Sequence, residues 1–142
     1  MNEFLIIITG ILGATTTFYV SHRLKQGSVR ASALLSLMVG LFFYTFPNLV
    51  NPFLTVNIPI VFIGTSFIGM VSLKTKRKYI QLTVAGILFS VIYLNKRHIF
   101  DGFGGALGAL ALISLLITLG GSVAFKKSSI KLLLSLRKKS NE

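Results

Sequence analysis

Few residues of this chain could take part in acid–base chemistry, and two of them are closely spaced. The acids are Glu3, Asp101 and Glu142, so Asp101 is the one acid away from the chain ends. His98 lies three positions before it, and the two side chains would share a face if this stretch is helical. A carboxylate next to a long apolar run suggests contact with an ion, a proton or a polar solute. The alternative is a helix cap, because an Asp before a helix accepts hydrogen bonds from free N–H groups.

A second polar group interrupts an apolar run in the middle of the chain. Thr65 and Ser66 stand between Gly64 and Gly69, and Asn57 precedes them. Short helices interrupted by glycine can expose carbonyls and hydroxyls to a permeating solute, so Thr65, Ser66 and Asn57 are candidate solute contacts. The alternative is ordinary packing, since Ser and Thr hydroxyls often bond carbonyls of their own helix.

Catalysis and metal binding are not predicted. A serine nucleophile needs a base within reach, and the chain holds only His22 and His98, which we expect on opposite sides of a membrane. The chain has no cysteine and no cluster of His and carboxylate residues that could hold a metal. We therefore expect no catalytic residue, no metal and no cofactor, and interpret the chain as a protein other than an enzyme.

The composition indicates a membrane setting for these residues. Hydrophobic side chains make up 53% of the 142 residues and charged ones 13%, which is too few to cover a water-soluble fold. The net charge of +12 could suggest nucleic-acid binding. However, the basic residues form short clusters between apolar runs, a pattern typical of charges that orient a membrane protein. We therefore expect the lipid bilayer, and no nucleic acid, as a partner.

Five apolar runs predict an all-α integral membrane protein, a bundle of about five transmembrane helices. The expected spans are about 4–20, 31–46, 59–73, 79–94 and 103–125, followed by a basic cytoplasmic tail over 126–142. The third run is the shortest, and it could either span the membrane or form a re-entrant helix. We place its start near Pro59, since proline suits the first turn of a helix, and its end before Lys74.

Charge counting predicts the orientation. Five spans place thirteen of the fifteen Lys and Arg residues on one side and leave Lys96 and Arg97 on the other. The positive-inside rule then puts the N-terminus outside and the C-terminus in the cytoplasm, in a cell membrane that we expect to be a bacterial inner membrane. The basic tail either lies on anionic lipid or serves only as a topology anchor.

Small residues at four-residue spacing predict close helix contacts. Gly104 and Gly108 form such a pair in the fifth run, while Gly13 and Gly40 lie on similar stripes in the first and second. Small side chains let helix backbones approach in lipid. The contacts could hold the monomer together or form a tight oligomer.

Two functional hypotheses follow from these patterns. The first is an oligomeric transporter or channel subunit for a small solute or ion, with Asp101 and the short third helix as its features. The alternative is a non-catalytic accessory subunit that packs against a larger membrane complex. A second copy of the chain or a larger complex is accordingly an expected partner.

Overall fold

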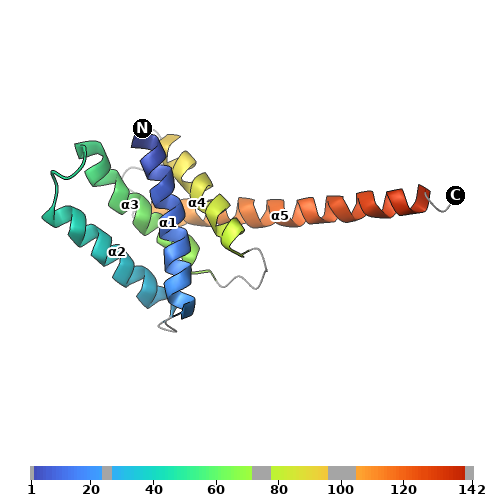
Figure 1. The fold of residues 1–142 in the computed structure, drawn as a ribbon, viewed down its shortest axis with the longest axis horizontal. Helices are drawn as coiled ribbons and strands as arrows, with labels where there is room; N and C mark the ends of the chain where they lie inside the picture. Colours follow the sequence, from blue (N-terminus) through green and yellow to red (C-terminus); the bar gives the residue numbers. More distant parts are fainter. Residues whose placement is uncertain (1, 24–26, 72–77, 96–104, 140–142) are drawn as a thin grey trace.

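The computed structural model describes residues 2–23, 27–71, 78–95 and 105–139, with the backbone alone at 78 and 126–139. The regular structure of these ranges consists of five α-helices: α1 (Asn2–Arg23), α2 (Ser28–Thr45), α3 (Pro52–Gly69), α4 (Lys78–Asn95) and α5 (Ala106–Lys139) (Figure 1). The predicted all-α helical bundle is confirmed. Four helices are long and apolar enough to cross a membrane, namely α1, α2, α3 and the part Ala106–Phe125 of α5, whereas α4 offers a shorter apolar stretch, Tyr79–Asn95.

Helices α1 to α4 alternate in direction around a central pair. Helix α1 packs against α2, α3 and α4, and α3 packs beside it (Figure 1). The late α1 residue Phe18 contacts Tyr79 in the first turn of α4, with ring centroids 5.5 Å apart. The hydroxyl of Ser32, near the start of α2, forms a hydrogen bond with the hydroxyl of Ser66, near the end of α3. The ends of α1 and α3 therefore lie at the same end of the bundle as the starts of α2 and α4.

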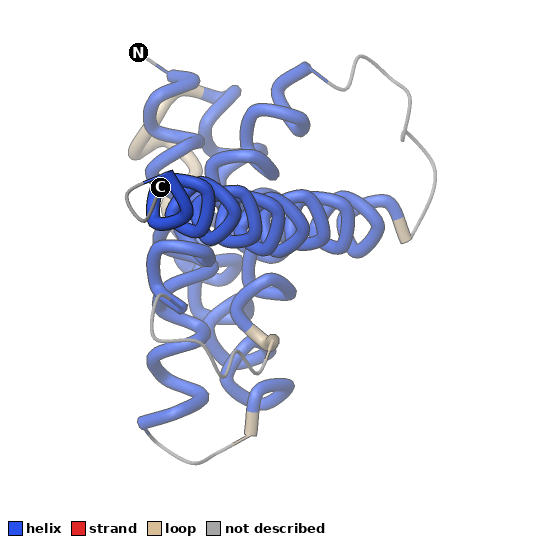
Figure 2. The backbone as a smooth tube through the Cα atoms, turned by 90° about the vertical axis from the view of Figure 1, so that its right-hand side faces the viewer, coloured by secondary structure: helices blue, strands red, loops and turns tan. Residues whose placement is uncertain are grey.

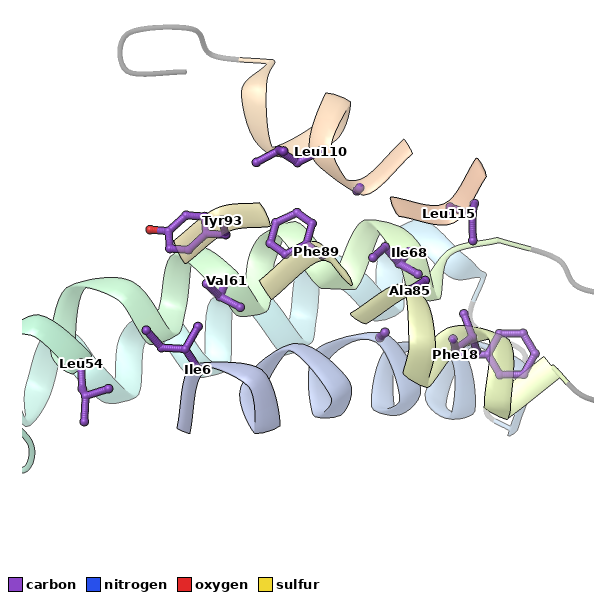
Figure 3. Close-up of a cluster of buried hydrophobic side chains, with 13 residues drawn as sticks. Ile6, Phe18, Leu54, Val61, Ile68, Ala85, Phe89, Tyr93, Leu110 and Leu115 are labelled. Carbon is purple, nitrogen blue, oxygen red and sulfur yellow. The ribbon is translucent and has the colours of Figure 1, made fainter. Parts of the chain in front are cut away.

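Helix α5 runs across the bundle, and its second half projects clear of the other helices (Figures 1 and 2). Its buried stripe includes Leu110, Ser114 and Thr118, which recur every fourth residue as one helix face requires. Figure 3 shows Leu110 over Phe89 and Tyr93. Leu110 thus lies near the end of α4, whereas Ser122 bonds Gln81 near its start, so the apolar part of α5 crosses α4 obliquely and in the opposite sense.

The core lies between α1, α3, α4 and α5. Its buried side chains include Ile6 and Phe18 of α1, Val61 and Ile68 of α3, Leu82 and Phe89 of α4, and Leu110 and Leu115 of α5 (Figure 3). The outer surface is apolar as well. Large side chains such as Leu37 and Met38 of α2 and Leu112 and Leu116 of α5 are more than half exposed.

The predicted start of the third helix at Pro59 is wrong. Helix α3 begins at Pro52, with Asn51 as its N-cap, and Pro59 lies inside it. The Asn51 carbonyl accepts hydrogen bonds from the backbone N–H groups of Leu54 at 2.8 Å and Thr55 at 3.0 Å. Pro52 thus takes the first-turn position expected for Pro59, whose ring removes only one N–H from an otherwise continuous helix. The helix also ends earlier than expected, at Gly69, and α5 continues beyond Phe125 to Lys139.

Candidate functional site

The residue pair that carries the acid–base hypothesis lies outside the described ranges. His98 and Asp101 both fall between α4 and α5 in a stretch that the structure does not describe, and so does Gly104. Their proposed contact with a solute therefore stays a prediction from the sequence.

Thr65 and Ser66 are both fully buried, and they face different neighbours. The Thr65 hydroxyl donates to the Val61 carbonyl of its own helix at 2.8 Å. A Cβ atom at Gly13 of α1 would collide with that hydroxyl, so Thr65 packs directly on α1. The Ser66 hydroxyl lies 2.7 Å from that of Ser32 on α2. The two candidate contacts thus belong to two different helix interfaces.

Ser66 is the centre of a hydroxyl cluster between α2 and α3. Its hydroxyl donates to the Ile63 carbonyl at 2.7 Å. The hydroxyls of Ser32 and Ser36, at 2.7 and 3.4 Å, then donate to the Ser66 oxygen, because its single proton is already used. Both lone pairs of that oxygen are therefore engaged by α2.

Asn57 lies apart from these hydroxyls and joins α3 to α4. The Tyr93 hydroxyl donates to Asn57 Oδ1 at 2.7 Å, and Asn57 Nδ2 donates to the Phe53 carbonyl at 2.7 Å. Eight residues separate Asn57 from Thr65 on one helix, or roughly 12 Å of rise. The structure therefore does not bring Asn57 together with Thr65 and Ser66.

Sequence reasoning missed a further polar contact, between α4 and α5. Gln81 Nε2 donates to the Ser122 hydroxyl at 3.0 Å, and Ser122 donates to the Leu119 carbonyl at 2.8 Å. Gln81 Oε1 and the Thr17 hydroxyl are buried without a hydrogen-bond partner in the described part of the protein. An amide side chain within a run of apolar residues was the signal that could have singled out Gln81.

The glycines divide into packed and open positions. Gly13 contacts α3 closely, since an added Cβ would lie 3.1 Å from the Phe62 carbonyl. Around Gly40 and Gly108, in contrast, an added Cβ would meet no atom within 4 Å. Two other glycines approach the α1 backbone more closely: a Cβ at Gly69 of α3 would lie 2.5 Å from the Ala14 carbonyl, and a Cβ at Gly86 of α4 would lie 2.8 Å from the Gly10 carbonyl. Gly10 and Gly86 were absent from the predicted packing positions.

The chemistry that these side chains offer is hydrogen bonding. The buried polar side chains of the described ranges are hydroxyls and one amide: Thr17, Ser32, Thr65, Ser66, Gln81, Ser90, Ser114 and Thr118. None of these groups exchanges a proton near neutral pH. Within the same ranges, no three His, Cys or carboxylate side chains lie close enough to hold a metal.

An open hollow of about 300 Å³ lies at the connection between α2 and α3. Its walls are Thr45, Phe46, Pro47, Asn48 and Leu49. None of the residues predicted to contact a solute lines it.

Comparison of the chain with protein-family models, curated proteins and solved structures found no match.

Proposed function

We propose that this chain is a multi-pass membrane protein with its N-terminus outside and its C-terminus in the cytoplasm, and that it serves as a non-catalytic subunit of a larger membrane assembly. The observation that carries the proposed role is the engagement of Thr65 and Ser66. These hydroxyls were the expected lining of a solute path, yet each is fully buried in a contact between helices. Polar groups that hold the helices of this chain together are not available to line a solute path, which favours the role of a non-catalytic subunit over that of a transporter.

The apolar outer surface supports the membrane setting. Leu34, Leu37, Met38 and Leu41 project from α2 with 58–67% of their surface exposed. In water this surface would favour aggregation, because exposed apolar patches of such extent are rare on soluble monomers. A bilayer covers them without a protein partner.

The alternating directions of α1 to α4 support the orientation. The ends of α1 and α3 and the starts of α2 and α4 share one end of the bundle, and the sequence that joins each of these two helix pairs is basic. The positive-inside rule assigns that end to the cytoplasm. Helix α5 crosses the other helices, and the bond from Gln81 to Ser122 holds its apolar part against the first turn of α4, ahead of the basic tail in the sequence.

A subunit of an oligomeric transporter is the second candidate, and Pro59 is the observation that favours it. Proline lacks an N–H, so the Thr55 carbonyl one turn earlier has no helical donor. Free carbonyls in interrupted membrane helices are used to bind ions and solutes.

Native mass spectrometry of the chain, extracted in mild detergent from the membrane that naturally contains it, tests the two roles. The accessory role predicts a complex with a different membrane protein at a fixed ratio. A mass equal to one copy or a multiple of copies of this chain would contradict that role. Proteoliposomes that contain the chain alone should then be assayed for proton and potassium flux. Flux above that of empty liposomes, abolished by Asp101→Asn, would support transport instead.

A further inference from the structure

The connection between α2 and α3, residues 46–51, carries no charge, and neither do the parts of the chain on either side of it. Every residue from Ala31 to Leu73 is uncharged. The charges that bound this stretch are Arg30, in the first turn of α2, and Lys74, which follows α3 in the sequence. Neither of them adjoins the connection, which we call the hairpin tip.

Helix α2 is too short to carry the hairpin tip across a bilayer into water. The rise from Arg30 to Thr45, the last residue of α2, is roughly 22 Å at about 1.5 Å per residue, whereas the hydrocarbon core is about 30 Å thick. One end of the helix must therefore lie below the membrane surface. Burial of the end that bears Arg30 would bring a charge into lipid, which is costly, whereas the other end has no charge to bury. The uncharged end, with the hairpin tip, is consequently the one that lies in lipid.

The side chains around the hairpin tip suit lipid better than water. Phe46 and Leu49 of the tip and Phe53 of α3 are 48–62% exposed. Phe42 packs beside Phe46, with ring centroids 5.6 Å apart, and extends the apolar surface along α2. Near the end of α2, Tyr44 is 83% exposed, and tyrosine is enriched where acyl chains meet headgroups.

The backbone of the hairpin tip is bonded partly within the protein. The Thr55 hydroxyl of α3 donates to the Pro47 carbonyl at 3.0 Å. The Asn51 carbonyl accepts the backbone N–H groups of two α3 residues at 2.8 and 3.0 Å. Pro47 and Pro52 have no N–H that would need a partner. A connection that depends so little on water for its hydrogen bonds can lie at the edge of the hydrocarbon region.

We propose that the hairpin tip is a lipid-binding surface, which inserts into the boundary between headgroups and acyl chains of the outer leaflet and stays out of bulk water. The proposal rests on the membrane setting proposed above and not on the accessory role.

The reactivity of single cysteines tests the depth of the hairpin tip. The chain contains no cysteine, so Val29→Cys, Met38→Cys and Leu49→Cys each introduce one thiol. The three native side chains are 71%, 67% and 62% exposed, so the protein itself covers them about equally. Val29 adjoins Arg30, Met38 lies in the middle of α2, and Leu49 lies in the tip. A membrane-impermeant maleimide reaches both faces of a phosphatidylcholine nanodisc, so the result does not depend on the orientation of the protein.

In nanodiscs that hold one copy each, Val29→Cys should react fastest and Met38→Cys slowest. Leu49→Cys should react at least about tenfold more slowly than Val29→Cys, because the reactive thiolate is disfavoured away from water. Rates measured in SDS normalise for the intrinsic reactivity of each thiol. In phosphatidylcholine with shorter acyl chains, the rate at Leu49→Cys should rise towards that at Val29→Cys, since a thinner bilayer removes the shortfall in helix length.

The outcomes separate the hairpin tip from the membrane setting. If Leu49→Cys reacts as fast as Val29→Cys while Met38→Cys is protected, the tip lies in water and the proposal is wrong, although the membrane setting holds. Equal rates at all three positions would refute the membrane setting as well. Protection of Leu49→Cys that requires two copies in one disc would assign the tip to a second copy instead of lipid. A rate at Leu49→Cys that is independent of chain length would contradict the argument from helix length.

Discussion

The contact between Gly10 and Gly86 makes a quantitative prediction about how α1 and α4 are held together. A methyl group at position 86 would lie 2.8 Å from the Gly10 carbonyl oxygen and 3.3 Å from the Ile11 Cα, and all the close atoms belong to the backbone. Rotation of a side chain cannot relieve such a clash. Since an ordinary contact begins at 3.4 Å, Gly86→Ala must separate the two helices locally by 3.4 minus 2.8, or 0.6 Å.

That separation has two costs. A gap of this size removes about a quarter or more of the dispersion attraction across the affected contacts. It also stretches the hydrogen bond from the Ser90 hydroxyl to the Ile6 carbonyl, which is already 3.4 Å long, to a length at which it no longer counts as a bond. Overpacking of this kind typically costs about 1–3 kcal/mol. Replacement of glycine by alanine in a helix returns up to about 1 kcal/mol through backbone propensity.

Gly40→Ala is the matched control, because it gives the same gain in propensity in a place where the new methyl meets nothing within 4 Å. The difference between the two variants therefore isolates the clash, and we expect Gly86→Ala to be less stable than Gly40→Ala by about 1–3 kcal/mol. Reversible unfolding in mixed micelles of increasing SDS content, followed by circular dichroism, gives both free energies. Equal stability of the two variants would show that α1 and α4 do not approach through Gly10 and Gly86.

Three further predictions concern the polar contacts, the tail and the orientation. Tyr93→Phe should lower the free energy of unfolding by about 0.6–1.7 kcal/mol in the same SDS titration, since it removes the donor to Asn57, whereas Tyr44→Phe at an 83% exposed position should have no effect. A peptide of residues 126–142 should bind vesicles of anionic lipid and lose that binding as salt is added, because charges are screened within about 8 Å at physiological ionic strength. Binding that is insensitive to salt would show that its leucines dominate. A reporter that works only in the cytoplasm should be active after Glu142 and silent at Asn51, and the reverse pattern would contradict the orientation with the N-terminus outside and the C-terminus in the cytoplasm.

The sequence predicts the helices of this protein better than it predicts their neighbours. Uncharged apolar runs of spanning length indicate helices wherever they occur, which explains the agreement for α1, α2 and α4. The start of α3 was predicted wrongly at Pro59, because the sequence alone does not distinguish a proline inside a helix from a proline in the first turn of a helix. The divergence of Thr65 and Ser66 was equally hidden. Adjacent residues on a helix point about 100° apart, and only the packed structure determines which helix each one meets.

The glycines show the same limit more clearly. Gly13, Gly40 and Gly108 all stand in sequence patterns that allow close approach, yet only Gly13 has a neighbouring helix against its Cα. Gly10 with Gly86, and Gly69 with Ala14, form close backbone contacts without belonging to the pattern that was used. A small residue allows another helix to come close, but close contact also requires a small residue at the facing position of that helix. The chain contains many small residues, so the sequence alone does not show which two of them face each other.

Polar and glycine contacts together explain why these helices choose these neighbours. In a bilayer, apolar surface discriminates poorly between another helix and a lipid tail. Each described helix pair with a strong preference carries a contact that lipid cannot imitate. The pairs are Gly10 with Gly86, Gly13 with Thr65, Ser32 with Ser66, Asn57 with Tyr93, and Gln81 with Ser122. Helices α1, α3 and α4 each take part in at least two of these pairs, so loss of one contact leaves another in place. Helices α2 and α5 each take part in one, so within this set no second pair backs up the contact of Ser32 with Ser66 or that of Gln81 with Ser122.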